Sequence, residues 1–284
     1  MTPHEKQQQV ILYHSKCIDG FGAAYAAWKK FGEEAEYIPV SYGKPLPEKM
    51  EERDVVFVDF CPTAKELEEF SARTKSIAIL DHHHGVKDVA TQYPGVFDTE
   101  HSGATISWSY FHPGEPTPKL LTFIEDGDLY RYALPETEEI YSYLIVEPYD
   151  FESWDRIVKA LETPEGEAKI LSTAKTYNEY FLKLAEMSVA GAKKVKFEGY
   201  EIGFGITHPV MAMKSHVGHE LASKWPPLAL VVSAHPDGFG VSIRGDGSVD
   251  VAAIARKYGG NGLKGSAGFF IPAGGPLPWE EVSE

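Results

Sequence analysis

Cysteine is scarce in this chain, and long apolar runs are missing. The 284 residues include two cysteines, Cys17 and Cys61, too few for the disulfide framework of a small secreted domain. No apolar run approaches the roughly 20 residues that a membrane-spanning helix needs. The first residues also lack the charged and apolar pattern of a signal peptide. We therefore expect a cytoplasmic protein that makes no contact with a membrane.

Positive charge is also in short supply. The chain has 27 Lys and Arg residues against 42 Asp and Glu residues, which gives a net charge of -15. Long nucleic acids bind through many phosphate contacts with clustered cations, so this balance argues against such a partner. A small anionic substrate, neutralised by bound metal and a few basic residues, is compatible with it. The apolar content of 43% leaves room for two domains with substantial cores.

One stretch joins an apolar run to a carboxylate and three imidazoles. Residues 76–80 read Ser-Ile-Ala-Ile-Leu, and Asp81, His82, His83 and His84 follow directly. The run predicts a buried strand of a parallel sheet. In open α/β sheets, ligands bind beyond the carboxyl ends of the strands, where these polar side chains would lie. Carboxylate and imidazole together favour manganese, iron or zinc, so we expect a metal site here rather than a solvated surface loop.

Two earlier segments also end in polar residues. Residues 10–13 predict a short strand, followed by a polar loop with His14 and Asp19 and then by a helix. Residues 54–60 predict a second strand, interrupted near its end by Asp59. An isolated buried carboxylate is very costly unless it is paired or bound to metal. We therefore interpret Asp59 as a metal ligand, with a structural hydrogen-bond acceptor as the alternative.

Further carboxylates, Asp126 and Asp128, follow an apolar segment at residues 120–124. An acidic loop or a helix cap would explain both, but the polar clusters before them favour a ligand role for one. The pattern is then helical from Pro148 to about Phe197, with a long amphipathic helix that we expect to connect two domains.

The last ninety or so residues are β-rich and less acidic. Arg244 ends one predicted strand, and residues 259–269 form a glycine-rich segment that includes Lys264. Such a loop exposes backbone N–H groups that can hold phosphate. Arg244 and Lys264 together therefore indicate an anion pocket, whereas a plain turn is the alternative for the glycines.

Asp-His-His after an apolar strand is the signature of the DHH phosphoesterase superfamily, and the chain resembles that superfamily over nearly its whole length. The superfamily's motifs are matched in order by His14 with Asp19, by Asp59, by Asp81-His82-His83 and by Asp126. Residues 242–269 resemble the DHH-associated substrate-binding domain and its glycine-rich signature.

The resemblance implies an α/β fold with two domains. A parallel-sheet catalytic domain with a helical connector would occupy residues 8–190. A smaller α+β substrate-binding domain would occupy residues 196–284, with the active site in the cleft between the two.

The resemblance also implies two divalent ions, in the first instance Mn²⁺, bridged by Asp59. His14 would hold the first ion, whereas the second would be held by Asp19, His82 and Asp126. His83 would lie near the scissile phosphate, and Asp81 would orient the histidines. The residues expected to hold another phosphate of the substrate are Arg244, Lys264, Gly262, Gly265 and Ser266.

Two positions depart from the superfamily pattern. Cys17 stands where the first motif usually has an aspartate, and it either ligates the first ion or leaves that ion weakly held. A cysteine ligand would favour iron or zinc over manganese. Leu263 stands where the glycine-rich signature usually has a histidine, so the family's usual nucleotide specificity does not transfer directly.

These features predict a two-metal hydrolase of phosphoric ester bonds. Its substrate would be a short oligonucleotide, a cyclic dinucleotide or a bisphosphorylated nucleotide. The alternatives are a polyphosphate or pyrophosphate hydrolase and a regulatory nucleotide-binding module without catalysis. The expected partner is a small anionic nucleotide or phosphate, and a homodimer is compatible with these features.

Overall fold

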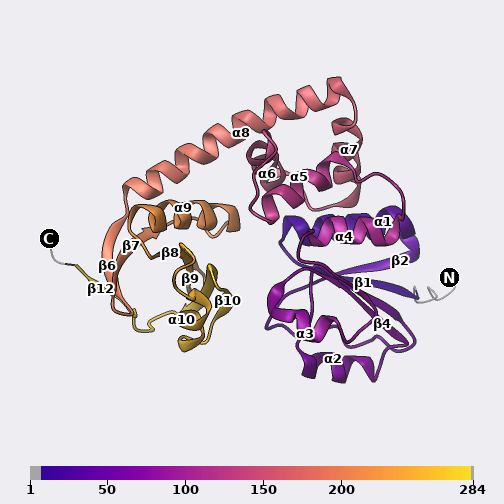
Figure 1. Ribbon diagram of the computed structural model, residues 1–284, viewed down its shortest axis with the longest axis horizontal. Coiled ribbons are helices and arrows are strands. Elements are labelled where there is room, and N and C mark those ends of the chain that lie inside the picture. The colour runs from indigo at the N-terminus through magenta and orange to yellow at the C-terminus, as the bar shows by residue number, and fades with distance from the viewer. Residues whose placement is uncertain (1–7, 283–284) are drawn as a thin grey trace. The chain divides into compact units, whose positions relative to one another are not determined.

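The computed structural model describes residues 8–282 and divides into two compact units between Asn178 and Glu179 (Figure 1). Charge is divided unequally between them. Residues 1–178 contain 17 Lys and Arg against 31 Asp and Glu, whereas residues 179–284 contain 10 against 11. Almost all of the negative excess therefore belongs to the first unit.

The first unit contains a five-stranded parallel sheet in the order β2-β1-β3-β4-β5. Its strands are β1 (Gln9–His14), β2 (Ala35–Val40), β3 (Asp54–Val58), β4 (Ser76–Asp81) and β5 (Gly95–Phe97). The three central strands β1, β3 and β4 are neighbours, so the residues that follow them meet at one edge of the sheet.

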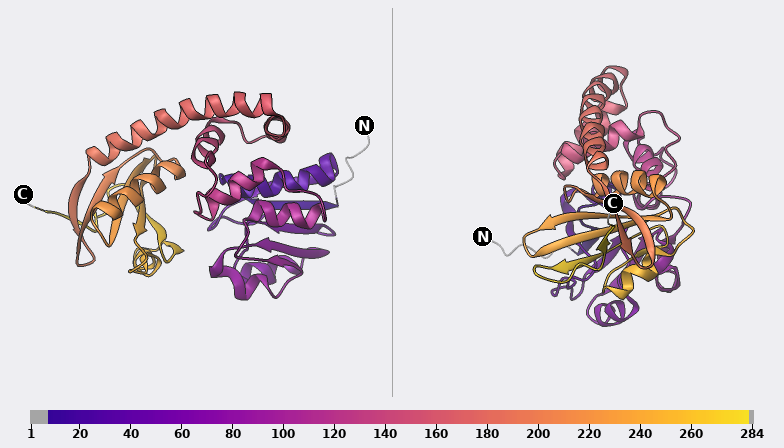
Figure 2. Two further views of the ribbon diagram at one scale, coloured as in Figure 1. Left: turned by 45° about the horizontal axis from the view of Figure 1, so that its top comes forward. Right: turned by 90° about the vertical axis from the view of Figure 1, so that its left-hand side faces the viewer.

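Helices cover both faces of this sheet (Figures 1 and 2). The helices of the unit are α1 (Ile18–Phe31), α2 (Ala64–Ser71), α3 (Lys87–Ala90), α4 (Gly103–Phe111), α5 (Lys119–Asp128), α6 (Thr137–Val146) and α7 (Phe151–Leu161), with 3₁₀ turns η1 (Gly32–Glu34) and η2 (His84–Val86). Because side chains alternate along a strand, Leu12 and Phe57 pack toward α2 and α3, whereas Ile11 and Val58 pack toward α1 and α4.

The second unit contains a seven-stranded sheet in the order β10-β11-β9-β8-β7-β6-β12, antiparallel except for the β7–β8 pair. Its strands are β6 (Lys193–Phe197), β7 (Tyr200–Ile206), β8 (Leu228–His235), β9 (Gly238–Gly245), β10 (Asn261–Leu263), β11 (Ser266–Pro272) and β12 (Glu280–Glu281). Helix α9 (Met211–Lys224) packs on Ala229 and Val231, and α10 (Val251–Lys257) packs on Leu230 and Ile243 of the other face.

Helix α8 (Pro164–Ala190) crosses the division between the units as one continuous helix (Figure 1). The predicted fold class is confirmed: a parallel-sheet domain, a helical connector and a smaller domain of helices and antiparallel strands. The exact domain ranges and the position of the site between the domains stay predictions. No helix within residues 8–282 combines the length and the apolar character needed to cross a membrane.

Two predicted segments differ from the structure. The helical pattern that we expected as far as about Phe197 ends at Ala190, and residues 193–197 form β6. The sequence Lys-Lys-Val-Lys-Phe alternates exposed and buried positions toward its end, which is strand periodicity. The glycine-rich segment is also a paired hairpin of β10 and β11 rather than an open loop.

Candidate metal centre

Three neighbouring strands bring the polar motifs together at the carboxyl edge of the first sheet. His14 is the last residue of β1, Asp59 follows β3, and Asp81 ends β4 directly before His82 and His83. The candidate metal centre therefore lies where an open parallel sheet places its ligands.

Asp59 lies at the middle of this cluster, with a side chain only 1% exposed. Its Oδ2 lies 3.4 Å from Nδ1 of His14, and its Oδ1 lies 3.2 Å from Nε2 of His82. All four of these buried atoms lack a hydrogen-bond partner of good geometry. Burial raises the pKa of Asp59, but the two imidazoles outweigh burial and hold it well below its usual range. Buried polar atoms without partners are rare, and one cation beside each pair would satisfy all four.

The backbone of Asp59 is also unusual. Its φ of 53° lies in the left-handed region, where few residues other than glycine are found. Such a conformation costs on the order of 1–3 kcal/mol and occurs preferentially at functional sites.

The potential ligand atoms form three overlapping groups, in each of which the atoms lie within 4.8 Å of one another. The groups are His14, Cys17 and Asp59; Asp59, His82 and His83; and Asp19, His82 and Asp128. Asp59 belongs to the first two groups, and His82 to the last two. This overlap is what two adjacent cations with a shared carboxylate would require, and the donor set fits divalent transition metals.

Asp19 is fixed by the amino end of α4. Its carboxylate accepts hydrogen bonds from the backbone N–H groups of Gly103 at 2.7 Å and Ala104 at 3.0 Å. A Cβ atom on Gly103 would approach Cβ of Asp59 to 2.5 Å, so only glycine permits this close packing. Burial and the carboxylates of Asp128 and Asp59 raise the pKa of Asp19 well above its usual range. The cluster is therefore rich in negative charge that a cation would neutralise.

Asp126 does not lie in the cluster, which corrects the prediction of this residue as a ligand. Its carboxylate accepts hydrogen bonds from the N–H groups of Ala133 and Leu134 at 2.9 and 3.0 Å and from the hydroxyl of Thr137 at 2.5 Å. Asp128 lies in the cluster instead, with Oδ2 3.5 Å from Nε2 of His82. Residues 119–128 are helical, and two residues along a helix point roughly 200° apart, so only one of the two carboxylates can face the cluster.

Asp81 and His83 are coupled directly. Oδ1 of the fully buried Asp81 accepts hydrogen bonds from the backbone N–H groups of His82 and His83, at 2.7 and 2.8 Å. The same oxygen lies 2.8 Å from Nδ1 of His83. Burial lowers the pKa of His83, but Asp81 and Asp59 outweigh burial and raise it to about 9. Asp81 thus fixes the side chain of His83 and the backbone of His82, and the placement of His83 near a scissile phosphate stays a prediction.

His82 contacts three carboxylates, because its Nε2 lies 3.2 Å from Asp59, 3.5 Å from Asp128 and 3.7 Å from Asp19. Burial lowers its pKa, but these carboxylates outweigh burial and raise it to about 10. Before metal is bound, the imidazolium of His82 is therefore the counter-charge for this part of the cluster.

Cys17 adds a thiol to the group with His14 and Asp59. Burial and the carboxylates of Asp59, Asp128 and Asp19 raise the pKa of this thiol well above its usual range. A bound cation would reverse this effect, because it stabilises the thiolate directly.

The second unit holds the predicted substrate-binding residues. Arg244, on β9, is 4% exposed and donates to Oγ of Ser215 at 2.9 Å and to the carbonyl of Ile243 at 3.0 Å. Ser266 is its partner on β11 in the sheet register, whereas Lys264 lies exposed in the turn of the β10–β11 hairpin. Gly262 and Gly265 also belong to this hairpin segment, and their binding role, like that of the other three, stays a prediction.

The residues of α9 that face Arg244 were not predicted from the sequence. Burial and the Arg244 charge lower the pKa of Lys214, and burial, Arg244 and His216 lower the pKa of His219. A Cβ atom on Gly218 would meet Cγ of Arg244 at 2.5 Å, so the guanidinium stem crosses α9 at this glycine. Ser215, Gly218 and His219 are three and four residues apart on one helical face, but this spacing does not show which element the face meets.

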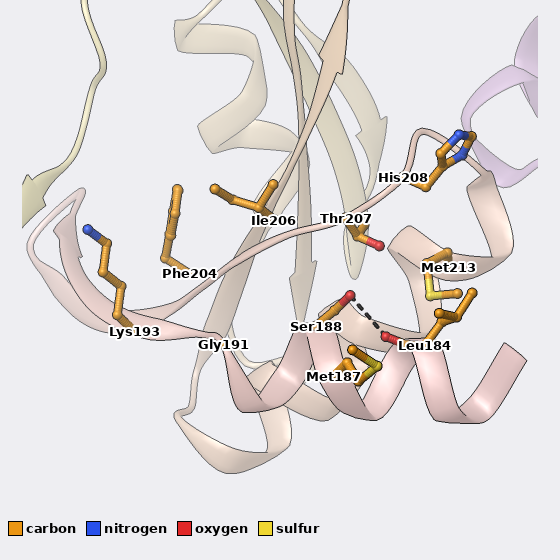
Figure 3. Close-up of a pocket in the computed structure, with 10 residues that line it drawn as sticks. All are labelled: Leu184, Met187, Ser188, Gly191, Lys193, Phe204, Ile206, Thr207, His208 and Met213. Atoms are coloured by element: carbon orange, nitrogen blue, oxygen red, sulfur yellow. Dashed lines mark hydrogen bonds between the residues drawn. The ribbon is translucent and has the colours of Figure 1, made fainter. Parts of the chain in front are cut away.

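Two cavities lie outside these clusters. One, of about 540 Å³, is lined by mostly apolar residues of the second unit, with Lys193 and His208 as its ionisable side chains (Figure 3). The other, of about 430 Å³, lies in the first unit and includes His101, which pairs with Asp98 at 2.8 Å. Neither contains any of the candidate ligand groups found among residues 8–282.

Comparison with known proteins found no matching family model. The chain is 27% identical, over 313 aligned positions, to the uncharacterised protein R106 of Acanthamoeba polyphaga mimivirus, covering 99% of this chain and 72% of that protein.

Several solved structures are similar in fold. The DHH domain of a member of the s1p family of ribosomal proteins has 14% identity and a TM-score of 0.60, with 93% of this chain and 83% of that chain covered. The pGpG-specific phosphodiesterase PggH from Vibrio cholerae has 10% identity and a TM-score of 0.51, with 93% of both chains covered. RecJ from Thermus thermophilus in complex with Mn²⁺ has 13% identity and a TM-score of 0.52 over 98% of this chain, which spans 54% of RecJ. The chain therefore has the fold that these structures share, a DHH domain among them.

Proposed function

We propose that this protein is a metal-dependent hydrolase of phosphoric ester bonds in a short nucleotide substrate. The observation that carries the proposal is Asp59, whose two carboxylate oxygens face different imidazoles, 3.4 Å from His14 and 3.2 Å from His82. A carboxylate that presents one oxygen to each of two ligand groups is suited to bridge two cations.

Two such ions, when bound, lower the pKa of a water molecule and stabilise the entering and leaving oxygens of a phosphoryl group. His14 and Cys17 with Asp59 would hold one ion, and Asp19, His82 and Asp128 the other. The chain's own residues supply the rest of the site. His83, oriented by its contact with Asp81, would donate a hydrogen bond or a proton to the reacting phosphate.

The second unit would hold the rest of the substrate. Arg244 and Lys214 of α9 form a cationic group beside His219, in a unit that has little excess charge of its own. A guanidinium binds phosphate through two parallel N–H donors, which gives both affinity and orientation. Ser266 and the hairpin that carries Lys264 lie beside Arg244 in the sheet register and would complete this anion pocket.

The comparisons support a nucleotide substrate without fixing its length. PggH is described as specific for pGpG, and RecJ as an exonuclease, so the fold is used on nucleotides of different lengths. The acidic first unit favours a substrate with few charges over a long nucleic acid. Polyphosphate is the second candidate, because a cationic pocket and two metal ions would serve it equally well.

The test is product release from a linear dinucleotide, a cyclic dinucleotide, a bisphosphorylated nucleotide and polyphosphate, each with Mn²⁺ or Zn²⁺ and with chelator. Metal-dependent turnover of a nucleotide would support the proposal, and turnover of polyphosphate alone would support the second candidate. No turnover of any of the four, with two ions bound per chain, would contradict both.

Variants test the roles of the named residues. Asp59→Asn should abolish turnover and reduce the metal content, whereas Asp54→Asn, at the half-buried start of the same strand, should leave both unchanged. Arg244→Ala should raise KM about 10-fold or more, because a charge-assisted hydrogen bond contributes about 1.5–3 kcal/mol. Arg256→Ala removes the same charge from an exposed position of the same unit and is the matched control. An unchanged KM in a folded Arg244→Ala protein would remove this residue from the substrate pocket.

A further inference from the structure

The two metal positions implied by the clusters have different donor atoms. The group of Asp19, His82 and Asp128 offers two carboxylates and one imidazole. The group of His14, Cys17 and Asp59 offers one carboxylate, one imidazole and one sulfur. Oxygen-rich sites suit manganese and magnesium, whereas a thiolate favours zinc, iron(II) or cobalt(II).

Cys17 is placed as a ligand would be. It precedes α1 at the N-cap position with extended backbone angles, φ -117° and ψ 134°, and its side chain makes no capping hydrogen bond. Ser, Thr, Asp and Asn are preferred at this position because their oxygens cap the helix, so a cysteine there forgoes that stabilisation. The thiol lies instead with ligand atoms of His14 and Asp59 within 4.8 Å.

A disulfide does not explain Cys17. Cys61 is the chain's other cysteine, and both cysteines are unpaired in the structure. Cys61 is 1% exposed, lies in the apolar core beneath β1 and β3, and donates from Sγ to the carbonyl of Pro62 at 3.4 Å.

The other two members of the group point to a cation site independently of the cysteine. Nδ1 of His14 and Oδ2 of the 1%-exposed Asp59 are both buried without a hydrogen-bond partner, and they lie 3.4 Å apart. One imidazole, one carboxylate and one thiolate leave a fourth tetrahedral position open, as catalytic zinc sites do.

We propose that Cys17 makes the first metal position selective for a thiophilic ion, so that the protein holds an unequal pair. Zn²⁺ or Fe²⁺ occupies the position of His14, Cys17 and Asp59, and a hard ion such as Mn²⁺ occupies the position of Asp19, His82 and Asp128. This inference rests on the metal-dependent function proposed above, but its test reads the ligands directly and does not require turnover.

The experiment is a Co²⁺ titration of the full-length, metal-free, reduced protein, followed by absorption spectroscopy. A thiolate bound to Co²⁺ gives an intense ligand-to-metal charge-transfer band in the near ultraviolet, which oxygen and nitrogen ligands do not give. The wild type should show this band at one equivalent of Co²⁺. Cys17→Ser and Cys17→Asp should lack it, and Cys61→Ser, with folding checked by circular dichroism, should retain it.

A competition titration tests selectivity. The concentration of Zn²⁺ that displaces Mn²⁺ from the first position should be at least 10-fold lower for the wild type than for the Cys17→Asp protein. Bound Co²⁺ without the band in the wild type, or a band that persists in Cys17→Ser, would overturn the inference. Either result would leave the proposed hydrolase intact, because turnover with Mn²⁺ is measured separately. The band in a protein that hydrolyses none of the four substrates would support the mixed site and contradict the function.

Discussion

At the residue scale, the two carboxylates near the end of α5 face different neighbours and so have different effects when they are changed. Asp128 contacts His82 in the cluster, whereas Asp126 holds the segment that leads into α6 through three hydrogen bonds. We therefore expect Asp128 to bind an ion and Asp126 to stabilise the folded state.

Asp128→Asn should lower the affinity for the second ion by at least about 100-fold, because loss of even an indirect partner of a ligand costs 10–100-fold. Asp126→Asn should keep two ions per chain but lower the free energy of unfolding by about 1–3 kcal/mol, the usual cost of a damaged buried hydrogen-bond network. Metal analysis and urea unfolding of both variants check this. The reverse pattern would restore Asp126 as the ligand.

We expect His82 to make metal binding depend on pH. Carboxylates raise its pKa to about 10 in the metal-free protein, above the ordinary value of 6.5, so the imidazole is protonated at pH 7 and must lose that proton to ligate an ion. In the metal-free protein its stabilising contribution is complete below pH 6.5 and is lost as the pH rises through 10.

We therefore expect metal affinity to rise from pH 7 to 9 and binding at pH 7.5 to release a proton. Calorimetry in buffers of different ionisation enthalpy measures the number released. His82→Asn should release fewer protons than the wild type. Equal release by both proteins would show that another group titrates.

At the scale of elements, the cluster depends on how closely α4 approaches the end of β3. A Cβ atom on Gly103 would lie 2.5 Å from Cβ of Asp59 and 2.8 Å from Oδ2 of Asp19, so any larger residue must push the helix away.

Gly103→Ala should destabilise the first unit by about 1–3 kcal/mol, as overpacking usually does, and weaken metal binding at the same time. Gly85→Ala is the control, because a Cβ atom there meets no atom within 4 Å and Gly85 lies just after the three histidines. Thermal unfolding with and without metal compares them. Normal metal affinity in Gly103→Ala would show that the helix can move without disturbing the ligands.

The elements also show what sequence patterns can and cannot predict. Apolar runs that end in polar residues were enough to predict β1, β3 and β4 and to bring His14, Asp59 and His82 to one edge. The choice between Asp126 and Asp128 needed the helical phase of α5, which a short apolar run does not define. The residues of α9 that face Arg244 depend on long-range packing, which no local pattern reports.

At the scale of the whole molecule, each unit has an apolar core of its own, with Trp154 and Leu121 in one and Val195 and Ile243 in another. The candidate ligands all belong to the first unit. A ligand that binds only the folded state stabilises the unit whose unfolding destroys the binding site.

Calorimetric unfolding should therefore show two transitions. Metal should raise the Tm of the first unit by several degrees and leave the Tm of the second unit unchanged. Substrate analogues that bind Arg244 should raise the Tm of the second unit. A single transition that shifts as a whole would show that the units unfold together.

The unequal division of charge has a kinetic consequence. The first unit has 31 acidic against 17 basic residues, so an anion approaching its metal centre meets a repulsive field that reaches about 8 Å at physiological ionic strength. The total repulsion is small for a substrate with two or three phosphates, whereas each added phosphate of a longer chain increases it. Added salt screens this field and should therefore increase kcat/KM for a short substrate. Salt has the opposite effect on proteins that bind nucleic acid through counterion release, because it weakens their binding. The negative charge of the first unit would then limit the length of the substrate by repulsion, without a steric barrier.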